Sequence, residues 1–452
     1  MYSGFPEVGP EQRLDKAEAL IPAAIHVSPE EAYARLQEPV PPNEGRLAML
    51  DGRPVYRFRT GRDRWIVYAD TGDLLVSVSQ AMALSVAARW TGRPATEAHF
   101  DGLLRDVDQW TVSGEYAALR PLFRYSWPDG EQLYVSSRTG EVVQYTTRRT
   151  RVAAYFGAIP HWWYWTPLRR NGGWWFRFVV WSSALATGAG MLGLVVGCWM
   201  YSPRRRYRFR GEPARIPYSG AKRWHMILGL VFGSLACTWS FSGLLSMEPF
   251  AWQGGVAAAL RDSSIRLDAF TPKPPSVALG QAGLPAKELD FVNLGGRPYF
   301  LTRQSAQVSR IVPVNGDPIG QFDTARIVDL VGNVAEAVVL RAYDAYYLDR
   351  NGRHPLPALR IRLADAKRSE YYVDLKTAEI VEAYDRRTRW NRWLYHGLHS
   401  WDLPWLYRYR PAWDVLVLAL LLGGISLSIT AVVLGWRASL RACASRRLTL
   451  LK

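Results

Sequence analysis

The sequence predicts an α-helical membrane protein that carries exported α+β domains and is built as a two-fold internal duplication. Three observations support this fold class. Three apolar stretches are each long enough to cross a bilayer, which takes about 20 residues. The chain of 452 residues contains 20 Trp, a residue type that favours membrane interfaces. Two segments at an offset of 238 are identical at 11 of 30 positions, a long-range repeat that indicates two copies of one plan.

The three predicted membrane helices cover residues 174–200, 224–247 and 412–436. Each is rich in Gly, Ala, Ser and Thr, the small residues that let membrane helices approach closely. Buried helices of a soluble protein are the alternative, but three spans of this length with Trp at their ends argue against it. We therefore expect contact with the lipid bilayer.

Basic residues in the short flanking segments predict the orientation of these helices. Residues 201–223 hold eight Lys or Arg and one acid, and residues 437–452 hold five and no acid. Such segments face the cytoplasm, so the regions before the first span and between the second and third are exported. The two basic segments carry +7 and +5 of the formal net charge of +16. Most of the net positive charge therefore indicates which segments face the cytoplasm, and we expect no nucleic-acid partner.

The repeat is clearest between residues 134–163 and 372–401, which share the run Arg-Arg-Thr-Arg and align His161 with His399. The second copy also has a preceding span, which ends with the sequence FSG at residues 241–243. The first copy begins with YSG at residues 2–4. We therefore expect a fourth helix, the first in order, to be missing, and a natural start upstream of Met1.

Each exported region is predicted to be a small α+β unit. Ser28 before Pro29-Glu30-Glu31 is typical of a helix N-terminus, with a side-chain cap and acids in the first turn. Alternating apolar residues around turn sequences predict hairpins. These hairpins pair residues 55–59 with 65–68, 122–127 with 133–137, 298–301 with 311–313, and 359–363 with 371–375.

Three motifs resemble the PepSY-associated transmembrane proteins of bacterial inner membranes. They are AYFGAIPHWWYWTPLRRN from Ala154, KRWHMILGL from Lys222 and LYHGLHSWDLPWLYRYRPAWD from Leu394, together with strand–turn phrases such as YVSSRTGEVV. The resemblance covers nearly the whole chain and implies four helices with periplasmic PepSY units. Some members are similar to haem-binding ferric-siderophore reductases. The missing first helix is a departure from this pattern and puts any ligand on that helix in doubt.

The expected order begins with a first PepSY-like region (1–160), a His/Trp interface segment (161–173), a membrane helix (174–200) and a cytoplasmic loop (201–223). The second half has a membrane helix (224–247), a second PepSY-like region (248–395), a second interface segment (396–411), a membrane helix (412–436) and a cytoplasmic tail (437–452).

Four of the seven His lie at membrane-associated positions and are candidate axial ligands of non-covalent haem b: His161, His225, His396 and His399. His225 opens a helix at its cytoplasmic end, and roughly 30 Å of hydrocarbon separates it from the others. The repeat suggests that His161 and His399 bind one haem, with His396 as the alternate ligand or a propionate partner. His225 would bind a second haem with its counterpart in the missing helix.

Arg169, Arg170 and Arg408 are candidate partners of haem propionates, because guanidinium binds carboxylate through two hydrogen bonds. Each His also has a simpler interpretation. His161 and His399 could be amphipathic anchors beside Trp at the interface, and His225 a juxtamembrane residue in a basic loop.

These residues favour an inner-membrane, haem-containing oxidoreductase that passes electrons to a periplasmic acceptor such as ferric-siderophore iron. The alternative is a non-enzymatic PepSY membrane protein that binds or regulates an envelope partner such as a peptidase. A transporter is disfavoured because the spans hold few charged residues, and Arg177 and Asp414 lie near their ends.

Overall fold

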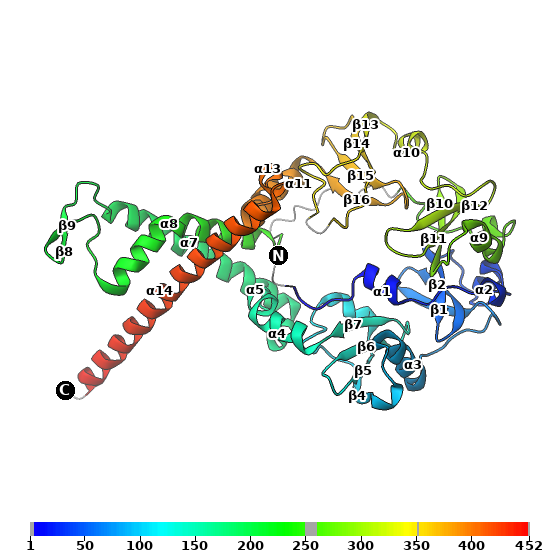
Figure 1. Cartoon of the computed structure of the whole chain (residues 1–452), viewed down its shortest axis with the longest axis horizontal. Helices are drawn as coiled ribbons and strands as arrows, with labels where there is room; N and C mark the ends of the chain where they lie inside the picture. Colours follow the sequence, from blue (N-terminus) through cyan, green and yellow to red (C-terminus); the bar gives the residue numbers. More distant parts are fainter. Residues whose placement is uncertain (1–3, 249–259, 350–351, 451–452) are drawn as a thin grey trace. The chain divides into compact units, whose positions relative to one another are not determined.

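The computed structural model describes residues 4–248, 260–349 and 352–450. Met1, and with it the expected start upstream of Met1, lies outside the described residues. The chain divides into two compact units (Figure 1). Unit 1 comprises Met1–Trp175, Gly255–Ala342 and Asp349–Ala383. Unit 2 comprises Phe176–Gly254, Tyr343–Leu348 and Tyr384–Lys452.

Unit 1 is centred on a six-stranded antiparallel sheet made of two three-stranded meanders. The first meander consists of β1 (Glu44–Leu50), β2 (Arg53–Thr60) and β3 (Asp63–Tyr68). The second consists of β10 (Glu288–Leu294), β11 (Arg297–Arg303) and β12 (Ser309–Pro313). The strand order is β12-β11-β10-β1-β2-β3, so β1 and β10 join the meanders. The hairpins β2–β3 and β11–β12 confirm two predictions, whereas the β1–β10 pairing was not predicted.

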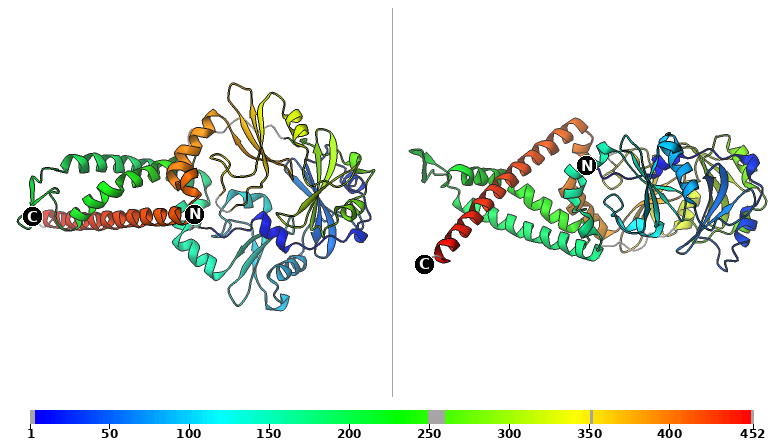
Figure 2. Two further views of the ribbon diagram at one scale, coloured as in Figure 1. Left: turned by 45° about the horizontal axis from the view of Figure 1, so that its top comes forward. Right: turned by 90° about the horizontal axis from the view of Figure 1, so that it is seen from below.

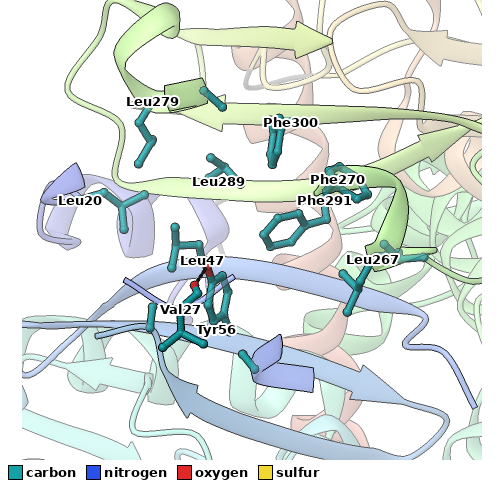
Figure 3. Close-up of a cluster of buried hydrophobic side chains, with 14 of the residues drawn as sticks. Leu20, Val27, Leu47, Tyr56, Leu267, Phe270, Leu279, Leu289, Phe291 and Phe300 are labelled. Atoms are coloured by element: carbon teal, nitrogen blue, oxygen red, sulfur yellow. Dashed lines mark hydrogen bonds between the residues drawn. The ribbon is translucent and has the colours of Figure 1, made fainter. Parts of the chain in front are cut away.

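One face of this sheet packs against three short helices. They are α2 (Pro29–Ala34), η4 (Leu267–Phe270) and α9 (Pro275–Ala282), and the short helix η1 (Pro22–Ala24) lies against α9. Figure 3 shows the resulting core, in which Leu47 and Tyr56 of the first meander meet Leu289 and Phe300 of the second. Each large apolar side chain buried here contributes about 1.5–3 kcal/mol. The two meanders therefore stabilise one another through one shared core.

The predicted N-terminus of α2 is confirmed. The Ser28 hydroxyl accepts a hydrogen bond from the Glu31 backbone N–H at 3.1 Å. Pro29 occupies the first turn, where a missing backbone N–H costs nothing.

Two four-stranded antiparallel sheets complete unit 1. The first contains β4 (His99–Leu104), β5 (Leu122–Ser126), β6 (Gln132–Ser136) and β7 (Val142–Thr146). The second contains β13 (Val334–Leu340), β14 (Ala358–Leu363), β15 (Glu370–Asp374) and β16 (Ile380–Tyr384). The β5–β6 and β14–β15 hairpins are as predicted. Helix α3 (Gln80–Thr91) packs on the first sheet through Ala83, Ala87 and Trp90, and α10 (Thr324–Val331) shares a core with the second through Ile327.

Shorter helices fill the connections of unit 1. They are α1 (Pro10–Lys16), η2 (Ala95–Glu97), η3 (Gly114–Leu119), α4 (Arg148–Phe156), α5 (Ala158–Trp162) and α6 (Thr166–Arg169).

Unit 2 contains the membrane part of the protein. Among the described residues, three helices are long and apolar enough to cross a membrane: α7 (Gly172–Met200), α8 (Gly220–Leu245) and α14 (Arg410–Leu450). They confirm the three predicted spans, and both views of Figure 2 show them as long ribbons. Helix α14 continues through the predicted basic tail. The loop between α7 and α8 forms an unpredicted hairpin of β8 (Tyr207–Phe209) and β9 (Glu212–Ala214).

Glycines allow α8 to pack closely against both neighbours. A Cβ atom added to Gly233 of α8 would lie 2.8 Å from the Leu194 side chain of α7. One added to Gly423 of α14 would overlap the Phe232 ring of α8. Small residues in the spans therefore have the packing role that their composition predicts.

Four short helices precede α14. They are α11 (Arg386–Asn391), the π-helix η5 (Arg392–Gly397), α12 (Leu398–Ser400) and α13 (Pro404–Tyr407).

Several elements recur along the chain at constant spacing. Helices α11, α13 and α14 follow α4, α6 and α7, respectively, at the same offset as the repeated sequence segments. Trp163 and Trp401, which that offset aligns, end short helices in the left-handed conformation with φ of 56° and 55°. In the sheets, β10 follows β1 at a slightly larger offset, and α10 follows α3 at this same larger offset.

Candidate functional site

The segment before α14 is anchored by a buried arginine. Arg392 begins η5 and is 4% exposed. Its Nε donates to the Ala345 carbonyl at 3.1 Å, and its Nη2 donates to the Asp402 carbonyl at 2.8 Å. This guanidinium therefore fixes the path of the chain around His396 and His399. Single π-helical turns occur frequently at functional sites, where they re-aim side chains.

His399 on α12 is held in one orientation by α8. Its Nδ1 lies 3.0 Å from the Ser242 hydroxyl oxygen. Ser242 donates its own hydrogen to the Trp239 carbonyl at 3.1 Å. When the hydroxyl hydrogen is donated to Trp239, the oxygen can only accept from Nδ1–H, and the lone pair of a neutral His399 is then on Nε2. This is the tautomer in which a histidine binds metal through Nε2.

A second hydroxyl–imidazole contact occurs at the other end of α8. His225 Nδ1 lies 2.9 Å from the hydroxyl oxygen of Thr430 on α14. Thr430 also lies 2.7 Å from the Leu427 carbonyl, and when it donates its hydrogen there its oxygen can accept from Nδ1–H of His225. His225 and Ser242 are separated by 17 residues of one helix, which is roughly 25 Å. The structure thus presents two imidazoles whose Nδ1 atoms contact hydroxyl oxygens near opposite ends of α8.

His225 lines a cavity of about 570 Å³ between α7, α8 and α14. Its walls are mostly apolar and include Gly190, Gly193 and Gly197 of α7, and a Cβ atom at Gly193 would meet no other atom within 4 Å. Lys222 lies one helical turn before His225 and is the cationic group of the lining. The volume is in the range of pockets that bind small molecules and cofactors. An imidazole, an ammonium group and apolar walls fit the iron, a propionate and the ring of a haem.

Three buried hydrogen-bond donors belong to α8 and to the segment before α14. Within the part of the chain that the structure describes, no partner is found for the indole N–H groups of Trp239 and Trp401 or for Nη1 of Arg392. A buried donor without a partner costs about 1–3 kcal/mol. Each of these donors is suited to bind a carboxylate or another oxygen atom.

The remaining predicted residues have different surroundings. The ring of Tyr395 lies 4.6 Å from His396 and 5.5 Å from His399, so the two histidines share one aromatic cluster. Arg408 is exposed and ends α13.

In unit 1, His161 lies in α5, and its ring centroid is 6.4 Å from that of Trp162. Because His161 belongs to unit 1 and His399 to unit 2, their pairing on one haem stays a prediction. Arg170 is exposed, with Nε 3.7 Å from Asp106. Arg169 donates to the Val112 carbonyl at 2.9 Å and lies over the Trp175 ring, so its guanidinium has a structural role.

Sequence reasoning missed Ser242 and Thr430. Both were counted among the small residues of the spans, where a hydroxyl commonly bonds to its own helix. Their second hydrogen bond reaches a different element, and only the helix packing reveals it. One signal was available, because a Ser or Thr inside a span can also support a histidine on a neighbouring helix.

Among residues 4–248, 260–349 and 352–450, no three His, Cys, Asp or Glu side chains gather as ligands of a bare metal ion. Comparison with family models, curated proteins and solved structures gives no match for this chain.

Proposed function

We propose that this membrane protein is a haem-containing oxidoreductase of a bacterial inner membrane. In this proposal it passes electrons across the bilayer to a periplasmic acceptor, ferric-siderophore iron. One observation carries the proposal: His225 and His399 each place Nδ1 within 3.0 Å of a Thr or Ser hydroxyl oxygen, near the two ends of one membrane helix. Haem b supplies one-electron redox chemistry when it is bound.

The contacts of each histidine support a ligand role. A ligating histidine usually donates its second N–H to an oxygen atom, which orients the ring and raises the basicity of the ligating nitrogen. Thr430 provides this oxygen for His225, and Ser242 provides it for His399. Histidines that serve only as interface anchors need no such partner. Lys222 on one side, and Trp239 and Trp401 on the other, would bind acidic substituents.

The constant offsets between elements support a second part of the proposal, that the chain consists of two PepSY-like copies. Each copy would comprise half of the six-stranded sheet, one four-stranded sheet and one His/Trp segment that leads into a membrane helix. The basic hairpin between α7 and α8 and the basic end of α14 favour a cytoplasmic location for those segments. The sheets of unit 1 would then lie in the periplasm.

Optical spectroscopy tests the proposal on the full-length protein, purified in detergent after expression with haem precursor. We expect Soret and α bands that shift on reduction with dithionite. His225→Ala and His399→Ala should each lower the haem content, because each removes one ligand. His99→Ala is the matched control, since His99 is an exposed residue of β4 and should leave the spectrum unchanged. Absence of reducible bands in the wild-type protein would refute the proposal.

The acceptor is tested separately, by mixing the reduced protein with a ferric siderophore in the presence of a ferrous-iron chelator. We expect formation of the ferrous chelate together with reoxidation of the protein bands. If the protein contains haem but does not reduce the siderophore, the proposed acceptor is wrong, whereas the proposed haem-based redox function stands. The non-enzymatic alternative predicts no haem bands and equal binding of an envelope partner by wild type, His225→Ala and His399→Ala.

A further inference from the structure

The second face of the six-stranded sheet carries a charged cavity that the proposed redox function does not use. Strand alternation places Leu47 and Leu289 in the apolar core and turns Arg46 and Asp290 to the opposite face. Above these residues lies a cavity of about 650 Å³, which we call the arginine basin. It lies within unit 1 and is centred on the junction of β1 and β10.

Guanidinium groups dominate the lining of the arginine basin. Seven arginines and five acidic residues line it, so positive groups exceed negative ones by two. Five of the arginines stand on strands of the sheet: Arg46, Arg57, Arg59, Arg64 and Arg303. Arg59 of β2 and Arg303 of β11 occupy corresponding positions of the two meanders, since the offset between them equals that between β1 and β10. Arginine clusters with this geometry bind planar oxygen anions such as carboxylate and phosphate.

Internal ion pairs engage six of these seven arginines and fix their positions, and Glu288 beside the basin pairs with both Arg13 and Arg46. Asp290 accepts from Arg46 Nε at 2.9 Å and lies 2.7 Å from Arg303 Nη2. Arg59 is paired with Glu44. The basin is therefore preorganised, which lowers the entropy cost of binding a ligand.

Two turns, one from each four-stranded sheet, accept hydrogen bonds from arginines of the basin. Arg57 Nη1 donates to the Thr139 carbonyl at 2.5 Å, in the turn Thr139-Gly140-Glu141. Arg261 Nε donates to the Thr377 carbonyl at 2.8 Å, and its Nη1 lies 2.8 Å from Glu379 in the corresponding turn. Each four-stranded sheet thus closes one side of the basin with the same kind of turn.

The lining of the basin also contains buried polar atoms without a hydrogen-bond partner among the described residues. Among the described residues, none accepts from the Nε–H groups of Arg57, Arg59 and Arg303, and none donates to Oδ1 of Asn293. Asn293 is 4% exposed, and the Arg57 side chain is 14% exposed. Unsatisfied donors of this kind are costly and gain most from a charged acceptor.

The surroundings of Arg57 also disfavour its protonated form. Burial lowers its pKa, Glu141 opposes this effect, and the neighbouring Arg46 and Arg13 lower the pKa further. An additional anion would stabilise the protonated guanidinium.

We propose that the arginine basin is a binding site for a small polyanion that carries at least two carboxylate or phosphate groups. The excess of guanidinium groups and their unsatisfied N–H donors exclude a cation as the preferred ligand. The volume of about 650 Å³ suits a small molecule. This inference does not rest on the proposed haem chemistry, because none of the histidines or membrane helices of that site contributes to the basin.

Isothermal titration calorimetry on the full-length protein in detergent tests the proposal, with citrate and pyrophosphate as probes at low ionic strength. We expect saturable binding of at least one probe. Arg59→Gln and Arg64→Gln should each weaken that binding about tenfold, the usual effect of removing one charge-assisted hydrogen bond. Arg62→Gln is the matched control, because Arg62 is exposed in the same β2–β3 connection and does not line the basin.

The outcomes separate the ligand classes. Binding of citrate alone assigns a carboxylate ligand, binding of pyrophosphate alone a phosphate ligand, and binding of both supports the shared chemistry. A basin filled only by water predicts no saturable heat with either probe and would overturn the proposal. Equal affinities of wild type, Arg59→Gln and Arg64→Gln would also overturn it, because the bound anion would then lie elsewhere. The haem spectrum should be the same in all three variants, which keeps this test separate from that of the redox function.

Discussion

Arg46 and Asp290 lie directly opposite each other in the antiparallel pair β1–β10, and Arg46 Nε donates to Asp290 Oδ1 at 2.9 Å. The offset between the two residues is the same one that relates β1 to β10 themselves. Each residue thus meets the residue at its own corresponding position. This is the arrangement expected at a two-fold axis between two similar strands, and it makes this ion pair the centre of the six-stranded sheet.

Asp290→Ala is expected to destabilise unit 1 by about 3 kcal/mol, because removal of one partner leaves buried charge without compensation. The side chain of Asp290 is 11% exposed and pairs with both Arg46 and Arg303. The change should lower the thermal unfolding midpoint of the full-length protein. It should also increase hydrogen–deuterium exchange in peptides from β1 and β10.

Asp63→Ala provides the control, since Asp63 is exposed on β3 and should change stability by less than about 0.5 kcal/mol. If Asp290→Ala exchanges hydrogen at β1 and β10 as slowly as wild type, the pair does not hold the two meanders together.

Acid should destabilise unit 1 through Glu141. Burial opposes ionisation of this carboxyl, but Arg57, Arg13 and Arg46 outweigh burial and lower its pKa from 4.5 to about 2. A carboxyl with a lower pKa in the folded protein contributes stability above its unfolded pKa and loses it as pH falls. We expect a loss of about 2 kcal/mol from this group between pH 5 and pH 2, measured by thermal unfolding at several pH values.

Glu141→Gln should flatten this acid dependence, although the variant is less stable at pH 7 because three arginines lose a partner. Glu97→Gln, at an exposed position, should keep the wild-type dependence. A Glu141→Gln protein with an unchanged acid slope would show that other carboxyls cause the effect.

The hairpins and the membrane helices could be predicted because their signals are local. Pro128-Asp129-Gly130 defines a turn within a few residues, and a run of apolar residues defines a span. The β1–β10 pairing could not be predicted in this way. It joins strands from the two halves of the chain, and β10 is buried along its whole length, so its alternation is hidden.

The sequence singled out the histidines of the candidate site but not the hydroxyl groups that contact them. Imidazoles next to membrane spans are conspicuous when the chain has only seven of them. The roles of Ser242 and Thr430 depend on which residue faces them from another helix. The π-turn at η5 likewise depends on tertiary contacts of Arg392, which local propensity does not describe.

Thr430→Val and Ser242→Ala should impair the two proposed haem sites independently. Each change removes the oxygen that accepts from a histidine Nδ1–H, and loss of such an outer partner typically lowers affinity 10–100-fold. Thr430→Val should weaken binding at the His225 end, and Ser242→Ala at the His399 end. Haem titration of the apoprotein, followed by absorbance, measures both affinities.

Each of these variants has a control about one helical turn or less away. Ser428 bonds to the Gly424 carbonyl of its own helix, and Ser240 bonds to the Ala236 carbonyl. Ser428→Ala and Ser240→Ala should therefore bind haem like wild type. Equal losses in the control variants would assign the effect to helix packing and contradict a role for the hydroxyl–imidazole contacts.

The turn at Thr139-Gly140-Glu141 provides a stability prediction that uses the two similar halves as an internal comparison. Gly140 has φ of +66°, and a Cβ atom added there would lie 2.8 Å from Leu50 Cδ1. Its counterpart in the repeated segment is Ala378, which adopts φ of +53° without a glycine. An L-residue in this conformation costs roughly 1–2 kcal/mol.

Gly140→Ala should therefore destabilise unit 1 by about 2 kcal/mol, through the left-handed backbone and the overlap with Leu50. The reverse change, Ala378→Gly, should alter stability by less than about 1 kcal/mol, because relief of the backbone strain is offset by loss of a buried methyl group. Thermal unfolding of the full-length variants measures both effects. A Gly140→Ala protein that is as stable as wild type would show that Leu50 and the turn can shift without cost. The β1 edge of the arginine basin would then be less rigid than its ion pairs indicate.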